Sequence, residues 1–184
     1  IAASSIPALE RNIKKFINMP DDLFAQELGE DGVIETSNLK AMKSIMQQGY
    51  ADLLQKVKQL GDTDSKYDSF KTLVGNIQEA TPDNKRIIVF SFYTETLKYL
   101  RRHLVNDGFN VALMYGKTPD DTPNNQKDED GFPVVGRNDI MRNFEKGEYD
   151  ILLVSEVGGE GLDFQFCSSL INYDLPYNPM RIEQ

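Results

Sequence analysis

Hydrophobic residues are spaced in two different ways along the chain, and the spacing changes just before the middle of the sequence. In the first part they recur at steps of three and four positions, the spacing that places side chains along one face of an α-helix. One such stripe ends at Pro20, a second runs from Leu39 to Leu60, and a third closes before Pro82. The pattern therefore predicts helices over residues 1–81.

From Arg86 onward, short apolar runs rich in β-branched residues alternate with helical patterns. Such runs are typical of buried strands. Strands are predicted over residues 87–90, 109–115, 150–154 and 169–173. The helices between them begin near Thr94 and at Arg137 and end at Gly108 and Gly147. Strands that alternate with helices form a parallel sheet covered on both faces, with right-handed crossovers, so the predicted fold class is α/β.

A polar stretch over residues 117–136, rich in Asp, Asn, Pro and Gly, interrupts this alternation and indicates an irregular loop. Acidic residues gather in it and are expected to be solvated: Asp120, Asp121, Asp128, Glu129 and Asp130. The preceding helix carries a basic group that is expected to face solvent, with contact to a nucleic-acid phosphate as the alternative: Lys98, Arg101 and Arg102. His103 is expected on the same solvated face rather than as a catalytic base.

Composition sets limits on the function. The 184 residues, 40% of them hydrophobic, are enough for one globular domain with a core and an appendage. The single cysteine, Cys167, excludes an internal disulfide, and the N-terminus lacks an apolar leader segment, so a cytoplasmic protein is expected. No apolar run approaches membrane-spanning length, and no membrane partner is expected. The formal net charge of −9 argues against strong nucleic-acid binding by this chain alone, although a local phosphate-contacting groove stays open.

The predicted strand 150–154 runs directly into residues 155–166, called here the glycine loop, which hold three glycines and three acids. Loops of this kind, at the carboxyl ends of strands in open α/β sheets, are where ligands bind. Gly158, Gly159 and Gly161 lack the Cβ that would hold the backbone away from a ligand. A tight strand-to-helix turn is the purely structural alternative.

Five segments of the second half match, in order, the motifs of one family. They are KRIIVFS at 85–91, MYG at 114–116, the helix that opens with Arg137 and carries Phe144 before Gly147, SEVGGEGLDFQF at 155–166, and YDLPYNPMRIEQ at 173–184. The set resembles the second RecA-like lobe of superfamily 2 helicases and translocases, most closely that of bacterial Swi/Snf-type ATPases. The resemblance implies that residues 82–184 are a parallel-sheet RecA-like helicase C-terminal lobe, truncated at the start of motif VI. Residues 1–81 would be a helical N-terminal extension or insertion.

The resemblance also implies that the chain is one half of an ATPase. The arginine-bearing continuation of motif VI would follow Gln184, and the chain has neither a Gly-x-x-x-x-Gly-Lys-Ser/Thr segment nor an Asp-Glu metal-binding pair after a strand. The end of the chain within a motif therefore indicates a piece of a longer protein. ATP would bind between this lobe and an N-terminal RecA-like lobe of the same protein, which would supply Mg²⁺. No catalytic residue is expected in the chain, and the chain alone is expected to be inactive.

Site residues are assigned by the same resemblance. The nucleotide side would be formed by Gly159, Glu160, Gly161, Asp163 and Gln184. The nucleic-acid backbone would be contacted by Ser91, Phe92, Ser155 and Gly158. Within these sets, Asp163 would accept a hydrogen bond from a ribose hydroxyl, and Gln184 would point into the cleft between the lobes.

The function implied is that of the second motor lobe of an ATP-dependent, Swi/Snf-like helicase or translocase that moves on DNA, in double-stranded form. Three alternatives stay open on the sequence. The chain could serve an RNA-directed superfamily 2 helicase, because backbone contacts do not read sequence. It could be a RecA-like protein-interaction module without catalysis, or an unrelated α/β nucleotide-binding domain.

Overall fold

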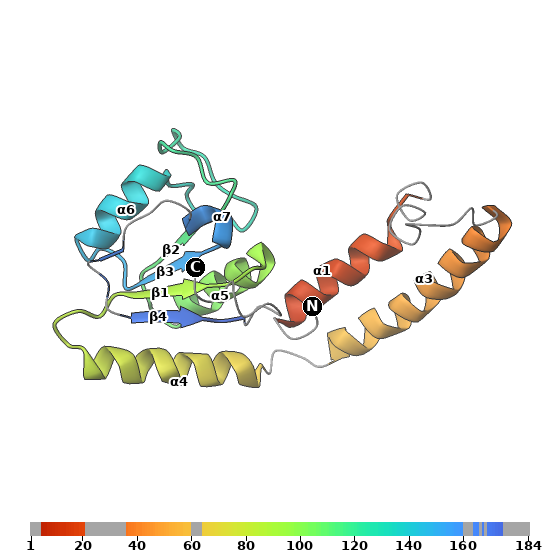
Figure 1. Ribbon diagram of the computed structural model, residues 1–184, viewed down its shortest axis with the longest axis horizontal. Coiled ribbons are helices and arrows are strands. Elements are labelled where there is room, and N and C mark those ends of the chain that lie inside the picture. Colours follow the sequence, from red (N-terminus) through yellow and green to blue (C-terminus); the bar gives the residue numbers. More distant parts are fainter. Residues whose placement is uncertain are drawn as a thin grey trace. The chain divides into compact units, whose positions relative to one another are not determined.

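The computed structural model describes residues 5–20, 36–59, 64–159, 164, 165, 167 and 169–174 (Figure 1). It divides into two compact units, residues 1–64 and 65–184. Each unit is considered by itself. Within the described residues, no helix combines the length and the apolar character that crossing a membrane would require.

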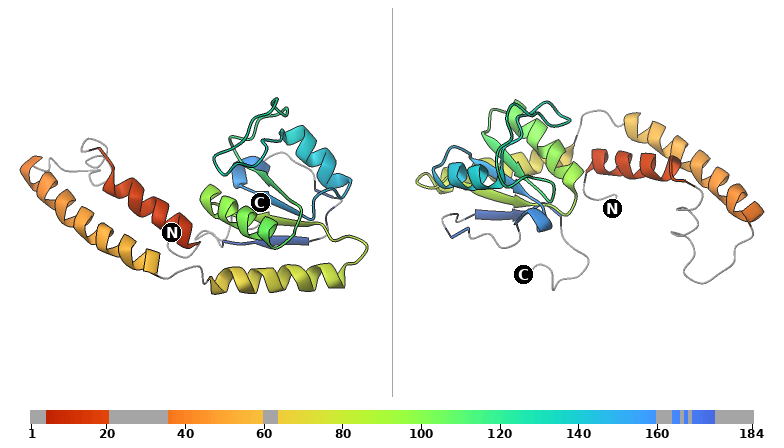
Figure 2. Two further views of the ribbon diagram at one scale, coloured as in Figure 1. Left: turned by 180° about the vertical axis from the view of Figure 1, so that it is seen from behind. Right: turned by 90° about the horizontal axis from the view of Figure 1, so that it is seen from above.

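In its described residues, the first unit contains two helices, α1 (Ile6–Ile17) and α3 (Thr36–Gln59). They lie side by side in both views of Figure 2 and contact each other. Ile13, on the predicted stripe of α1, is buried, and the side chain of Gln47 on α3 donates to the Ile17 carbonyl at 2.7 Å. The predicted helices of this part are therefore confirmed for its described residues.

The second unit is built on a four-stranded sheet in which every strand pair is parallel. Its strands are β1 (Ile87–Phe90), β2 (Val111–Met114), β3 (Ile151–Val154) and β4 (Ser169–Asn172). Their order across the sheet is β2-β3-β1-β4, with Ile87 opposite both Ile151 and Ser169. The predicted α/β class with a parallel sheet is confirmed.

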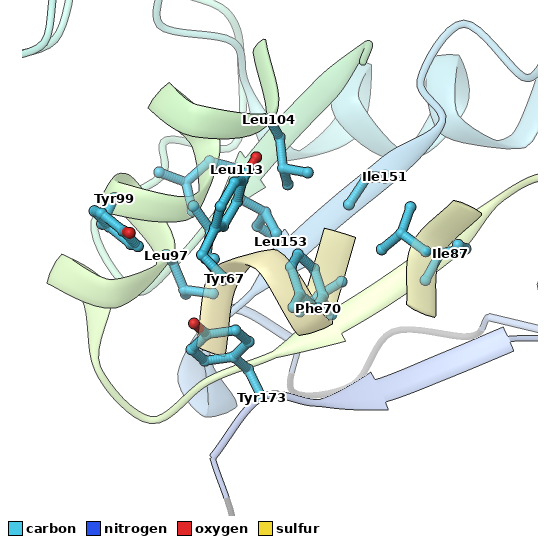
Figure 3. Close-up of a cluster of buried hydrophobic side chains, with 13 residues drawn as sticks. Tyr67, Phe70, Ile87, Leu97, Tyr99, Leu104, Leu113, Ile151, Leu153 and Tyr173 are labelled. Carbon is cyan, nitrogen blue, oxygen red and sulfur yellow. The ribbon is translucent and has the colours of Figure 1, made fainter. Parts of the chain in front are cut away.

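Alternate residues of each strand point to opposite faces of this sheet, and both faces are covered. Val89 and Leu153 belong to a cluster with residues of α4 (Ser65–Ala80) and α5 (Thr94–Asn106), which Figure 3 shows. Ile88 and Leu152 belong to a second cluster with Ile140 and Phe144 of α6 (Arg137–Glu145). Burial on both sides explains why β1, β2 and β3 are continuous apolar runs, whereas β4 alternates and leaves Leu170 exposed.

Helix α4 belongs to the unit that holds the sheet. Its side chains Tyr67, Phe70 and Val74 are buried in the first cluster. The compact unit consequently begins at Ser65, whereas the sequence placed the start of the lobe at residue 82. The reason is that α4 packs against sheet and helix residues that follow it in the chain, which its own periodicity cannot reveal.

A polar contact ties α4 to the end of α5. The Tyr67 hydroxyl donates to Asp107 Oδ2 at 2.6 Å, and Lys71 Nζ lies 2.8 Å from Asp107 Oδ1. The ring of His103 packs on two aromatic rings, with centroids 5.0 Å from Tyr67 and 4.3 Å from Tyr99. The expectation that His103 lies on a solvated face holds only in part, because aromatic side chains of α4 and α5 pack against the ring and leave it half-buried.

The expectation of a solvated acidic loop is wrong for Asp128 and Asp130, whose side chains are 19% and 14% exposed, whereas Glu129 is exposed as expected. Residues 126–134 form a small hairpin, called here the acidic hairpin, closed by the bond from Asp128 N–H to the Phe132 carbonyl at 2.9 Å and turned at Gly131, whose φ is +82°. Its carboxylates pair with the basic residues of α5. The predicted solvated helix face is thus covered at Lys98 and Arg101, because opposite charges distant in sequence meet there, while Arg102 stays 40% exposed. Asp120 and Asp121, in the first half of the loop, are exposed as expected.

Replacing Tyr67 by Phe tests the contact between α4 and α5. Loss of the hydroxyl should cost about 1 kcal/mol of unfolding free energy near neutral pH. Burial, reinforced by Asp107, raises the pKa of Tyr67 above its ordinary value of 10.0. The stability that depends on the neutral phenol is therefore complete below about pH 10 and is lost as the pH rises further, and the variant should lack this loss.

Urea unfolding at pH 7 and at pH 10–11 measures both effects. Tyr149→Phe, half-buried against the second cluster on the opposite face of the sheet, is the matched control. Equal stabilities of Tyr67→Phe and the control at every pH would contradict the assigned contact.

Candidate functional site

The carboxyl ends of β1 and β3 lie side by side and mark the point where the connections diverge. From β1 the chain passes to β2 on one side, and from β3 it passes to β4 on the other (Figure 1). Crevices at such reversal points are the ligand sites of open α/β sheets. Two predicted site residues occupy this point, Ser91 after β1 and Ser155 after β3. Both are buried, at 3% and 7% exposure.

Ser155 holds the start of the glycine loop. Its N–H donates to the Met114 carbonyl at 3.1 Å, and its Oγ accepts from the Gly158 N–H at 3.1 Å. The Gly159 N–H donates to the Ser155 carbonyl at 2.9 Å, which closes the short helix α7 (Glu156–Gly159). The loop therefore begins as a tight strand-to-helix turn with Ser155 at its cap. Such a turn is compatible both with a ligand-binding role of the glycines and with a purely structural one. A serine hydroxyl that accepts one hydrogen bond can also donate one, so Ser155 can donate to a ligand.

Close packing explains two of the glycines. A Cβ on Gly158 would lie 2.5 Å from the Met114 carbonyl oxygen and 2.8 Å from Tyr115 Cα, both of which are backbone atoms. A Cβ on Gly159 would lie 2.9 Å from a methyl carbon of Val154 and 3.1 Å from the ring of Phe90. These distances are too short for any larger residue without displacement. The loop backbone is consequently seated directly on the strand ends.

Arg137 is a site residue that sequence reasoning left without a role. Its Nη1 donates to the Gly158 carbonyl at 3.0 Å, and its own N–H donates to the Pro119 carbonyl at 2.7 Å. Gly136, before it, is packed against the loop at Asp121, where a Cβ would lie 2.3 Å from the carbonyl carbon. The signal available in the sequence was the position of Arg137 at the opening of a helix shortly before the glycine loop.

Ser91 is engaged within the lobe. Its N–H donates to the Val154 carbonyl at 3.2 Å, its Oγ accepts from the Tyr93 N–H at 3.2 Å, and its hydroxyl donates to Asp174. Lys66 of α4 bonds the other oxygen of the Asp174 carboxylate at 3.3 Å. This carboxylate would repel an approaching phosphate, so phosphate contact by Ser91 requires Asp174 to turn away. Contact by Ser91 with nucleic acid stays a prediction.

The other predicted site residues divide into exposed and undescribed ones. Phe92 is exposed to 36% at the end of β1, where it can meet a partner. Four of the predicted nucleotide-binding residues lie outside the described residues: Glu160, Gly161, Asp163 and Gln184. Across the part of the chain that the structure describes, no group of three or more His, Cys, Asp or Glu residues gathers where it could hold a metal ion.

Replacing Gly158 by Ala tests the packing of the glycine loop. The added methyl must push against the backbone at Met114 and Tyr115, so the variant should lose about 1–3 kcal/mol of unfolding free energy. Gly75→Ala is the matched control, since nothing lies within 4 Å of a Cβ there. In the interior of α4 this control should gain about 0.5–1 kcal/mol. Chemical denaturation compares the two, and equal effects would contradict the packing.

Replacing Arg137 by Ala tests whether this side chain positions the loop. The variant should expose the amides of Gly158 and Gly159 to hydrogen exchange about tenfold faster, because one charged bond to the loop is lost. Arg142→Ala removes an exposed arginine, paired with Asp139, from the same helix and is the control. Hydrogen-exchange mass spectrometry measures the exchange rates of the loop amides, and unchanged rates in Arg137→Ala would refute the positioning role.

Comparison with known proteins places this geometry in a family. Residues 65–184 match the family described as helicase conserved C-terminal domain. The match begins at the residue where the compact unit with the sheet begins. It covers the strands, the glycine loop and the helices on both faces of the sheet.

Individual relatives agree with this match. The chain is 32% identical over 143 residues to an uncharacterized ATP-dependent helicase, YqhH, of Bacillus subtilis, which covers 71% of the chain and 23% of that protein. It is 33% identical over 109 residues to the ATP-dependent RNA helicase RhlB of Shewanella frigidimarina, covering 59% of the chain and 21% of that protein. The chain therefore spans less than a quarter of the length of these relatives.

A solved structure shares the fold. The Hef helicase domain of Pyrococcus furiosus matches with a TM-score of 0.56 over 98% of the chain and 33% of that structure, at 24% sequence identity. This similarity concerns the fold alone. The match over residues 65–184, more than half of the chain, shows that the chain belongs to the family of helicase conserved C-terminal domains.

Proposed function

We propose that the chain is the second motor lobe of an ATP-dependent helicase or translocase that moves along nucleic acid. The observation that carries the proposal is the glycine loop, seated on the strand ends at the reversal point of the sheet in a member of the helicase C-terminal domain family. The complete motor is part of the proposal, because the chain spans less than a quarter of relatives such as YqhH.

In this proposal the lobe forms one wall of an ATP site. ATP hydrolysis supplies the free energy for opening and closing the two lobes. Gly159, Glu160, Gly161 and Asp163 would face the nucleotide, with Gln184 pointing into the cleft. The described part of the loop fits this role, because tight glycine packing brings its backbone down onto the carboxyl ends of the strands, where such ligands bind. Since the chain has no phosphate-cradling Gly-Lys-Ser/Thr segment, an N-terminal RecA-like lobe would hold the phosphates and Mg²⁺.

The same edge of the sheet would contact the nucleic-acid backbone. Ser155 has a hydroxyl that can donate to a phosphate oxygen, and Gly158 lies in the same turn. Phe92 exposes its ring at the end of β1, and Ser91 is available if Asp174 turns away. We favour double-stranded DNA as the track and a Swi/Snf-like, cytoplasmic parent protein. RNA is the second candidate, supported by the similarity to a protein named as an RNA helicase.

Steady-state ATP hydrolysis by a full-length protein that contains this chain tests the proposal. Turnover should rise with added nucleic acid, and duplex DNA should stimulate it more than RNA does. The 184-residue chain alone should show none. An absence of turnover with every nucleic acid would reject the motor and favour a protein-interaction module.

Replacing Asp163 by Ala in the full-length protein tests the nucleotide side. Loss of a charged acceptor for a ribose hydroxyl should lower kcat/KM for ATP about tenfold to a hundredfold. Asp83→Ala, an exposed acid in the turn before β1, is the control and should leave turnover unchanged. A variant at Asp163 with the turnover of the control would remove that residue from the proposed site.

A further inference from the structure

The acidic hairpin is held in a defined conformation by its own hydrogen bonds. The Val134 N–H donates to the Gln126 carbonyl at 2.9 Å, and Lys127 faces Pro133 across the two arms. Asp128 Oδ1 accepts from the N–H groups of Asp130 and Phe132, each at 3.0 Å. These bonds fix the tip of the hairpin and present three consecutive acids in one direction.

Those acids meet the three cations of α5 at Lys98, Arg101 and Arg102, which share one helix face by their spacing. Lys98 pairs with Glu129 and, at 3.2 Å, with Glu95 of its own helix. Arg101 pairs with Asp128 and, at 3.2 Å, with Asp130. Arg102 lies 2.7 Å from Asp130. The side chains of Lys98 and Arg101 are only 10% and 9% exposed, so the hairpin covers them.

The covered surface has the character of a site for anions. Within residues 65–184 it is the only place where three basic residues fall within five positions. The guanidinium of Arg101 lies 4.2 Å from the ring of Phe132, while its Nε is buried without a hydrogen-bond partner. The hairpin therefore neutralises these cations without meeting all of their donors. Ion pairs of this kind weaken as salt or a competing polyanion is added.

We propose that the acidic hairpin is a built-in competitor for nucleic-acid phosphates, which occupies the α5 cations and keeps this surface closed until a nucleic acid displaces it. The surface is a second contact, formed by α5 rather than by the glycine loop. The proposal rests on the proposed function only in naming nucleic acid as the competing polyanion.

Removing the three carboxylates tests it on the 184-residue chain. The variant Asp128→Asn/Glu129→Gln/Asp130→Asn should bind labelled duplex DNA or single-stranded RNA about ten- to fiftyfold more tightly than the wild type at ~50 mM salt. The slope of log affinity against log salt should steepen by about 2.7 for duplex DNA, the value for three released phosphate contacts. Fluorescence anisotropy across a salt series measures both quantities.

The matched control removes the same charge from elsewhere. Asp83→Asn/Glu145→Gln/Glu148→Gln replaces three exposed acids, so that either variant changes the formal net charge from −9 by three, to −6. Tighter binding by the hairpin variant than by this control supports the proposal, and equal binding overturns it. Adding Lys98→Ala and Arg102→Ala to the hairpin variant should return the affinity to that of the control. Retained affinity in this combination would also overturn the proposal.

A variant with a shortened hairpin keeps the proposal testable if the first variant does not fold. The Val134 N–H donates to the Gln126 carbonyl, so residues 127–133 can be replaced by Asn-Gly, a two-residue turn that closes a hydrogen-bonded pair of this kind. This variant lacks all three acids and should gain affinity as the first one does. Failure to gain over the control would overturn the proposal. Because no nucleotide is used, the outcome is independent of the ATP hydrolysis that decides the proposed function.

Discussion

Burial of the two central strands on both faces is the constraint from which the rest of the second unit follows. Val89 and Leu153 face α4 and α5, whereas Ile88 and Leu152 face α6, and all four are buried. A sheet with two apolar faces needs helices on both, and such strands are joined through crossovers. Polar chemistry is thereby confined to the strand ends, where Ser155 and the glycine loop lie.

Local signals in the sequence predicted most of this framework. The strand at 87–90 has the predicted bounds, and the other three differ from prediction by at most two residues at either end. The helix stops at Gly108 and Gly147 are confirmed by their positive φ angles of +90° and +79°. Each of these features depends on neighbours within one turn or one strand. The placement of Ser155 and Gly158 at the carboxyl edge follows in the same way, since an apolar run leads directly into them.

Contacts between distant segments could not be predicted. Lys98 and Glu129 are 31 positions apart, and Arg137 and Gly158 are 21 apart. Periodicity shows which face of an element is buried, but the path of a loop decides which charges it brings together. The same reason hid the aromatic neighbours of His103 and the packing of α4, whose partners come later in the chain.

The bond between Lys66 and Asp174 connects the first turn of α4 to the carboxyl edge of the sheet. Lys66 stands in the first turn of α4, one residue after the second unit begins, and Asp174 also accepts from Ser91 at the end of β1. A displacement of the first turn of α4 would therefore disturb the Asp174 carboxylate and, through it, the hydroxyl of Ser91. The start of α4 is thus coupled to the candidate site through two side-chain contacts of Asp174.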